Sequence, residues 1–197
     1  MAVLRERLCE LCRAMKFPVL MLKGFEADDV IGSMAKRAEK EGFTTYMVTP
    51  DKDYGQLITT NIFQYKPGKA GGEVEVIGKE QVCANYGICE PQQVIDILTI
   101  WGDSSDNVPG IRGIGEVGAK KLIGKYGYLE NIIEHVSELP QKQQESINSS
   151  LEQIKMSRFL VTIKKDIELP VKLDDIKFNV EEYEIIPIKF LENNKNT

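Results

Sequence analysis

The start of the chain combines a helical spacing of hydrophobic residues with a short apolar run. Leu4, Leu8, Leu11 and Met15 recur at helical spacing, which predicts an opening helix with a core-facing stripe. Residues 17–22 then form a continuous apolar segment, as in a strand buried on both faces of a parallel sheet. We therefore expect a helix followed by a buried strand.

The same alternation is repeated in the next thirty residues. Residues 30–38 carry a second helical stripe, and Gly42 marks the end of that helix. Residues 44–49 are rich in Thr, Tyr and Val, the composition of a strand. The order strand, helix, strand, helix predicts an α/β fold with a parallel sheet.

Hydrophobic spacing changes again beyond residue 60. Residues 62–65 and 73–77 flank a Gly-rich stretch and predict a hairpin. Residues 79–86 and 91–101 predict two helices, and the chain from 106 to about 165 has helical patterning throughout. These boundaries predict an α/β core over 1–105, a helical lobe over 106–170 and an extension over 171–197.

Acidic residues come in three short groups along this framework. The seven carboxylates are those of Glu26, Asp28, Asp29, Asp51, Asp53, Asp103 and Asp106. Each group alone is typical of a helix cap or a turn, but in an open sheet the carboxyl ends of strands share one edge, where two of the groups fall. Gathered carboxylates repel one another unless a cation lies among them, so the pattern predicts sites for Mg or Mn.

A glycine-rich turn follows the third acidic group directly. The turn and the helix after it supply backbone amides and basic side chains that suit DNA phosphates. The expected DNA-binding residues are Arg112, Gly113, Ile114, Gly115, Val117, Gly118, Lys120, Lys121 and Lys125. The simpler interpretation is a plain helix-turn-helix connection with a solvated lysine face.

Overall charge does not exclude a polyanionic partner. The formal charge is -5, but outside the seven grouped acids 23 acidic residues face 25 Lys and Arg, a balance of +2. Four cysteines and one histidine lack the spacing of a zinc site. No long apolar run predicts a membrane segment, and we expect a protein of the reducing cytoplasm.

Three motifs resemble the 5'-nuclease family, which includes flap endonucleases and the 5'-nuclease domains of bacterial DNA polymerases I. They are residues 24–32 (GFEADDVIG), residues 51–57 with their Asp-Lys-Asp block, and residues 102–110, which lead into a helix-hairpin-helix. Residues 157–166 resemble the segment that ends this domain in the polymerases. The likeness covers nearly the whole chain.

The resemblance implies a PIN-like or Rossmann-like nuclease core with a helix-hairpin-helix lobe, acting in replication and repair. It assigns Glu26 and Asp28 to one metal centre, with Asp29 close by, and Asp51, Asp53, Asp103 and Asp106 to the other. Two Mg or Mn ions would drive hydrolysis of DNA carrying a 5' flap or 5' end. It also implies a potassium ion on the hairpin carbonyls, a polymerase domain in the same native chain, and a place at the bacterial nucleoid.

Two departures from the family pattern change these expectations. Pro50 stands where the family usually has Gly, with little expected effect. The family's amino-terminal third, with further metal-binding acids and a basic arch, has no counterpart, so we expect a truncated chain whose first metal centre is incomplete and which cuts slowly or not at all. A non-catalytic DNA-binding module and a metal-dependent phosphatase of small molecules remain alternatives.

Overall fold

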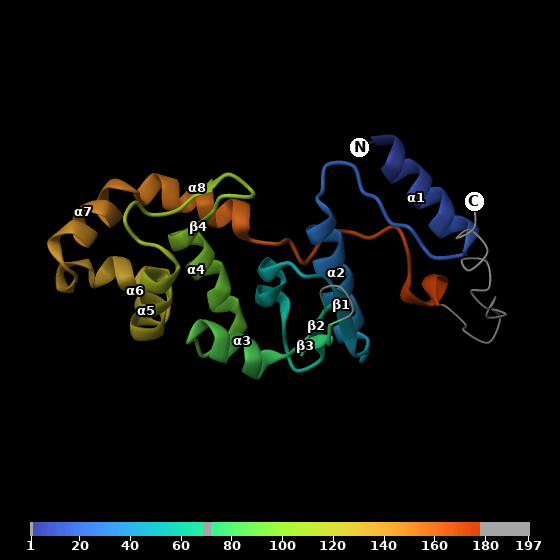
Figure 1. Cartoon of the computed structure of the whole chain (residues 1–197), viewed down its shortest axis with the longest axis horizontal. Helices are drawn as coiled ribbons and strands as arrows, with labels where there is room; N and C mark the ends of the chain where they lie inside the picture. Colours follow the sequence, from blue (N-terminus) through green and yellow to red (C-terminus); the bar gives the residue numbers. More distant parts are fainter. Residues whose placement is uncertain (1, 69–71, 178–197) are drawn as a thin grey trace, which may run out of the picture. The chain divides into compact units, whose positions relative to one another are not determined.

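The computed structural model describes residues 2–68 and 72–177 of the 197-residue chain (Figure 1). The chain divides into two compact units, one made of Met1–Leu20 with Pro170–Thr197 and the other of Met21–Leu169. Within the described ranges, no helix is both long and apolar enough to cross a membrane. The second unit contains all seven grouped acids.

The first unit contains the predicted opening helix, α1 (Ala2–Ala14), and the short 3-10 helix η5 (Leu173–Ile176). The expectation that the apolar stripe of α1 faces a core is wrong, because Leu4 is 71% and Leu8 58% exposed. Helical spacing shows that a helix has an apolar face, but it does not supply the surface that covers that face.

The strand predicted over residues 17–22 is also wrong. The segment is irregular, with Phe17 41% and Met21 61% exposed. A strand needs a hydrogen-bonded neighbour, and among the described strands β1 (Thr45–Val48) pairs with β2 (Ile62–Lys66) alone. The apolar run therefore has the composition of a strand but joins neither of the two sheets in the described part of the chain.

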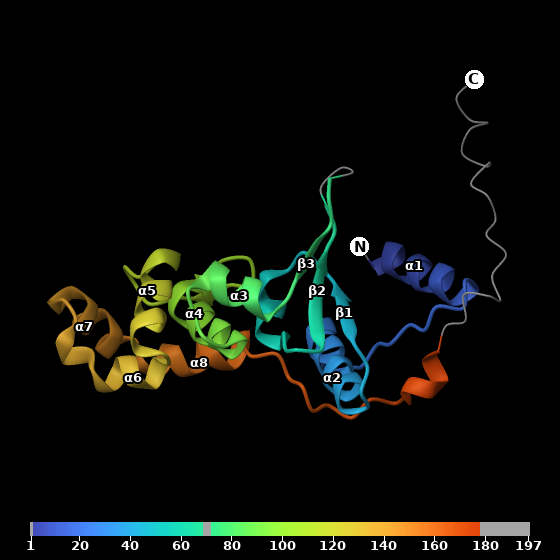
Figure 2. The same cartoon turned by 90° about the horizontal axis from the view of Figure 1, so that it is seen from below.

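The sheet of the second unit has three strands in the order β1-β2-β3 (Figure 2). β1 and β2 run parallel, with Thr45 opposite Ile62, whereas β2 and β3 (Glu75–Ile77) run antiparallel. The predicted hairpin is thus confirmed, and the sheet is mixed with one parallel pair. Helix α2 (Ala27–Lys40) contacts β1, as the alternation of elements predicts.

The remainder of the second unit is mainly helical. Its elements are η1 (Lys52–Leu57), α3 (Lys79–Tyr86), η3 (Pro91–Gln93), α4 (Val94–Trp101), β4 (Gly102–Asp103), β5 (Val108–Pro109), α5 (Glu116–Tyr126), α6 (Leu129–Glu134), η4 (Val136–Glu138), α7 (Gln141–Ser149) and α8 (Leu151–Val161). The predicted helices at 79–86 and 91–101 are confirmed, the latter with a first 3-10 turn at Pro91. The strand β5 and the end of α8 at Val161 differ from the uninterrupted helical patterning expected up to 165.

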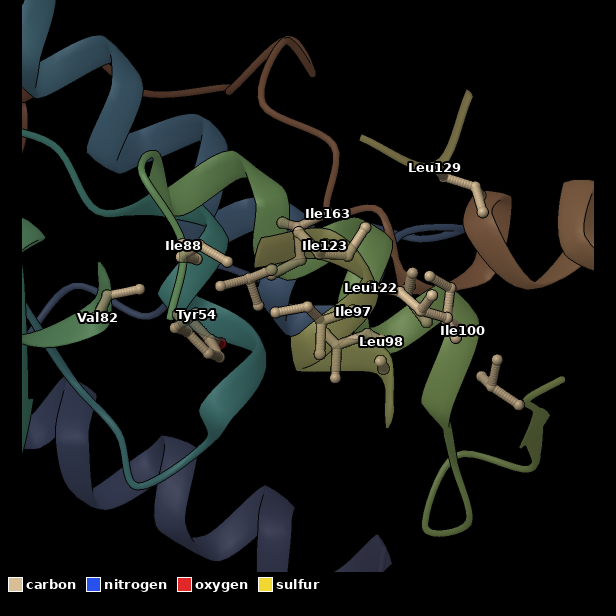
Figure 3. Close-up of a cluster of buried hydrophobic side chains, with 14 of the residues drawn as sticks. Tyr54, Val82, Ile88, Ile97, Leu98, Ile100, Leu122, Ile123, Leu129 and Ile163 are labelled. Carbon is tan, nitrogen blue, oxygen red and sulfur yellow. The ribbon is translucent and has the colours of Figure 1, made fainter. Parts of the chain in front are cut away.

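Helix α4 lies at the centre of the hydrophobic core (Figure 3). It contacts η1, α5 and α8, and Ile97, Leu98 and Ile100 on it are fully buried. Burial of a side chain of this size stabilises the fold by roughly 2 kcal/mol. Because α4 ends immediately before β4, the core fixes the position from which Asp103 projects.

The end of α8 and the residues after it form hydrogen bonds with η1 and α2. The buried side chain of Gln56 donates a hydrogen bond to the Val161 carbonyl at 2.9 Å and accepts one from the Ile163 amide at 3.0 Å. The Lys164 amide donates to Asp29 Oδ1 at 2.9 Å. Gly32 allows this approach, since a Cβ there would lie 2.8 Å from Ile163 Cγ2 and 3.1 Å from the Lys164 carbonyl oxygen.

We predict that Gly32→Ala destabilises the protein by about 1–3 kcal/mol, because the added methyl overpacks this contact. In an unobstructed helix the same change would stabilise by up to about 1 kcal/mol. Gly55→Ala is the matched control, since its Cβ would meet Val94 at an ordinary 3.6 Å. Chemical denaturation measures both variants; an equal or raised stability for Gly32→Ala would show that the segment does not pack closely on α2.

Candidate metal centre

Three carboxylates from separate elements meet in the second unit. Asp53 lies in η1, Asp103 in β4, and Asp106 in the turn between β4 and β5. One oxygen atom from each lies within 4.8 Å of the others. Residues fifty positions apart in the sequence therefore share one site.

The other predicted acids lie around the same cleft. It has a volume of about 240 Å³ and is lined by Glu26, Asp28, Asp29, Asp51, Asp53 and Asp106, with the apolar residues Val108 and Leu160 among its walls. Asp103 joins these six through the three-carboxylate cluster. The structure thus places all seven predicted acids in or beside one acidic cleft.

Asp51 and Asp29 also make the capping contacts that the simpler interpretation expects. Asp51 is the N-cap of η1, and its Oδ1 accepts a hydrogen bond from the Asp53 amide at 3.0 Å. Asp29 Oδ2 accepts from the Glu26 amide at 3.4 Å, which closes a capping box at the start of α2. Each carboxylate has further lone pairs, so capping does not exclude metal binding by the same residues.

Asp103 is held by an ion pair that orients it. Its side chain is 4% exposed, and its Oδ2 lies 2.6 Å from Lys52 Nζ. Its Oδ1 accepts hydrogen bonds from the amide and hydroxyl of Ser105. Burial alone would raise the pKa of Asp103, but the bonds from Lys52 and Ser105 lower that pKa to about 2.

The surroundings of Asp53 raise its pKa, whereas those of Asp103 lower the pKa of Asp103. It is 9% exposed, and its Oδ1 is buried without a hydrogen-bond partner among the described residues. Burial and the negative charges of Asp51 and Asp103 raise the pKa of Asp53 to about 7. A buried oxygen without a donor, facing two further carboxylates, is the arrangement that a bound cation would neutralise.

The donor set fits a hard divalent ion. The cluster offers carboxylate oxygens and contains no cysteine sulfur or histidine nitrogen. Oxygen ligands of this kind suit Mg²⁺ or Mn²⁺ and are unfavourable for metals that prefer sulfur or nitrogen. Asp53, Asp103 and Asp106 would hold one ion, and Glu26, Asp28, Asp29 and Asp51 provide further carboxylates along the same cleft.

Three polar residues that support the acids were not singled out in the sequence. The hydroxyl of Tyr54 donates to Asp28 Oδ1 at 2.7 Å, and the Gln64 amide donates to the carbonyls of Asp51 and Thr49 at 2.6 and 3.0 Å. Lys52 stood between two acids in the sequence, but its partner Asp103 is fifty-one positions away. Only the position of Lys52 inside the Asp-Lys-Asp block gave a sequence signal.

The glycine-rich turn lies between β5 and α5. Arg112 and Gly113 are exposed, and Gly113 has φ +82°, a conformation that favours glycine. Gly115 is the N-cap of α5, with open space around its Cα. Ile114 is buried at 5% exposure, and its amide donates a hydrogen bond to the Ile111 carbonyl at 3.0 Å.

The remaining predicted DNA-binding side chains differ in their surroundings. Val117 is 68% exposed and Lys121 is exposed, whereas Gly118 packs close to Ile114. Lys120 contacts Glu116 at 2.8 Å and donates to the Asn85 carbonyl at 3.0 Å. Lys125 donates to the Tyr126 hydroxyl at 2.7 Å. The turn is therefore open, while Lys120 and Lys125 also have partners within the chain.

Two family models match consecutive parts of the chain. The 5'-3' exonuclease N-terminal resolvase-like domain matches residues 3–87, and the 5'-3' exonuclease C-terminal SAM fold matches residues 89–184. DNA polymerase I of Bacillus caldotenax is 36% identical over 184 residues, which are 93% of this chain and 21% of that protein. A 5'-3' exonuclease of Aquifex aeolicus is 35% identical over 168 residues, 85% of this chain and 55% of that protein. The chain thus spans about a fifth of the polymerase and about half of the exonuclease.

Solved structures of similar fold include a flap endonuclease. The bacteriophage T5 flap endonuclease, in a pseudo-enzyme-product complex with DNA and metal ions, matches with a TM-score of 0.67 and 25% identity, covering 77% of this chain and 54% of that one. The catalytic core of Rad2 with a DNA substrate matches with a TM-score of 0.56 and 16% identity, covering 85% and 57%. The second likeness concerns the fold alone.

We predict that Asp53→Asn and Asp106→Asn each weaken Mn²⁺ binding by about tenfold or more, because each removes a ligand charge. Asp166→Asn is the control, since Asp166 is exposed and outside the cluster. Isothermal titration calorimetry measures the affinities. Unchanged affinity in both cluster variants would exclude Asp53 and Asp106 as ligands.

We also predict that the metal-free protein loses stability as the pH rises from about 4 to about 7. The folded-state pKa of Asp53, about 7, lies above the unfolded value of about 3.9, so the native state holds this proton more tightly and the benefit disappears as the pH passes 7. Asp103, with a pKa of about 2, stays ionised across this window.

Thermal unfolding in EDTA tests this pH dependence, and Asp53→Asn should flatten it. Addition of Mn²⁺ should restore the stability of the unaltered protein at pH 7.5, because the ion neutralises the ionised cluster. A pH dependence that persists unchanged in Asp53→Asn would assign the effect to other groups.

Proposed function

The chain belongs to the 5'-3' exonuclease family. We propose that the parent protein hydrolyses DNA phosphodiesters at 5' ends and 5' flaps with Mg²⁺ or Mn²⁺, and that this chain by itself cuts slowly or not at all. One observation carries this proposal. Asp53, Asp103 and Asp106 converge from two parts of the chain, and the buried Oδ1 of Asp53 has no hydrogen-bond partner among the described residues. The chain spans about a fifth of the polymerase that it matches. The activity of a whole protein of this kind is therefore a proposal.

Each group of residues takes a distinct part in the proposed reaction. Asp53, Asp103 and Asp106, with Asp51 beside them, would hold one divalent ion, while Glu26 and Asp28, with Asp29 close by, would serve a second position in the cleft. Divalent ions held there would supply the positive charge for activating water and for stabilising the phosphoryl group and the leaving oxygen. Lys52 orients Asp103, and Tyr54 orients Asp28, through the contacts already described.

The DNA is proposed to contact the turn that precedes α5. The open backbone at Gly113 and Gly115 and the exposed side chains of Arg112 and Lys121 suit phosphate oxygens, without reading base sequence. The DNA and metal ions named for the T5 flap endonuclease complex support DNA as the partner and a metal as the cofactor. A potassium ion on the turn's carbonyls and a polymerase domain in the same native chain belong to the same proposal.

We predict that this chain cuts a 5'-labelled flap duplex only slowly in Mg²⁺ or Mn²⁺, and that Asp53→Asn lowers that single-turnover rate by at least about 100-fold. The loss follows from removal of a ligand to the ion, and EDTA should have the same effect. Asp166→Asn is the control and should cut at the unaltered rate. Cleavage by Asp53→Asn at the unaltered rate would contradict the proposal.

Arg112→Ala with Lys121→Ala tests the DNA contact at the turn, and Asp53→Asn separates a nuclease from a non-catalytic module. In the nuclease, the double variant should weaken DNA binding while leaving Mn²⁺ affinity unchanged, because the two side chains lie outside the acidic cluster. A module without catalysis predicts that metal ions have no effect on the DNA and that Asp53→Asn behaves as the unaltered protein in every assay.

A further inference from the structure

A second cavity lies next to the acidic cleft, at the carboxyl end of β1. Its volume is about 180 Å³, and its polar lining comes from Lys52, Gln64, Lys66, Asn85, Tyr86, Glu116 and Lys120. These residues belong to η1, β2, α3 and α5, so four elements of one compact unit form its walls. The acidic cleft and this cavity are lined by neighbouring residues of the same segment, Asp51 and Asp53 on one side and Lys52 on the other.

The charge of this cavity is opposite to that of the acidic cleft. Three ammonium groups line it and only one carboxylate, that of Glu116. Lys120 lies 2.8 Å from Glu116, and Lys52 is paired with Asp103, which does not line the cavity. The ion pair of Lys66 with Glu75 is longer, at 3.8 Å, and both side chains are about half exposed. Such a pair contributes little by itself, so Lys66 can turn to another anion at small cost.

Neutral groups complete a wall suited to phosphate oxygens. Lys120 Nζ lies 4.8 Å from the centre of the Tyr86 ring, which holds the ammonium at the cavity. Burial, together with the charges of Asp53 and Glu116, raises the pKa of Tyr86 to about 12, so its hydroxyl stays a neutral donor at physiological pH. Ammonium and hydroxyl donors with a single carboxylate favour a small anion over a cation or an apolar ligand.

The position of the cavity links the two places where DNA is proposed to act. Lys52 bonds to Asp103 of the metal cluster, while Glu116 and Lys120 belong to the first turns of α5, directly after the glycine-rich turn. A strand held at the turn and cut at the cluster would pass beside this cavity. The strand would reach this cavity from the turn without contacting a further anion-binding element.

We propose that this cavity binds a phosphodiester group of the DNA strand between the glycine-rich turn and the acidic cleft, with Lys66 and Lys120 as its cationic contacts. The inference rests on the proposed nuclease function and adds a phosphate subsite to it. Lys66 is the sharper probe, because it contacts none of the seven acids and lies outside the turn.

The test measures binding of a flap duplex by fluorescence anisotropy in EDTA, at several salt concentrations, for Lys66→Ala and Lys66→Glu. Lys79 provides the control variants, Lys79→Ala and Lys79→Glu, since it forms a surface ion pair of similar exposure with Glu90, shorter at 2.8 Å, and does not line the cavity. We expect about a 3–10-fold weaker affinity for Lys66→Ala, a larger loss for Lys66→Glu, and a salt slope less steep by about 0.9. The Lys79 variants should bind as the unaltered chain.

The outcomes separate this inference from the function on which it rests. If the unaltered chain binds the duplex and both Lys66 variants bind it equally well with the same salt slope, the subsite is wrong and the nuclease proposal stands. If the unaltered chain does not bind the duplex, both proposals fail. A calorimetric titration with inorganic phosphate distinguishes the source of the anion: phosphate binding that Lys66→Ala abolishes, with unchanged DNA affinity, would assign the cavity to free phosphate and overturn the DNA contact.

Discussion

Mutual repulsion of carboxylates is the constraint on which the site depends. Asp53, Asp103 and Asp106 lie within 4.8 Å of one another, a separation at which two like charges repel by about 4 kcal/mol near a protein surface. Two features reduce this repulsion. Lys52 pairs with Asp103, and Asp53, with a pKa of about 7, keeps its proton up to that pH. Both devices indicate a site arranged for a cation of higher charge.

Holding these groups together requires a rigid frame, and the buried helix α4 provides it. Beyond α4, Gly102 has φ +83°, and a Cβ there would collide with the backbone of Gly110, so the two glycines allow the tight crossing of β4 and β5 that directs Asp103 into the site. Gln56 and Asp29 bind the segment after α8 on the other side. Packing far from the cleft thus determines the distances within it.

Local patterns predicted the elements that depend on local chemistry. The helix at 27–40, the hairpin and the helix at 79–86 follow from apolar spacing and Gly or Pro positions, and the three acidic groups pointed to one site. Patterns could not supply a partner for residues 17–22 or a cover for the stripe of α1, because both depend on other segments. The pairing of Lys52 with Asp103 was also hidden, since nothing in the sequence states which distant acid a lysine meets.

The most direct test of the account is anomalous X-ray diffraction from crystals of the protein grown with Mn²⁺. We predict an anomalous peak at the cluster, with carboxylate oxygens of Asp53, Asp103 and Asp106 at metal-ligand distances of roughly 2.0–2.6 Å. Crystals that diffract well and bind Mn²⁺ elsewhere, with the three carboxylates directed away from one another, would contradict the claim that these acids form a metal centre.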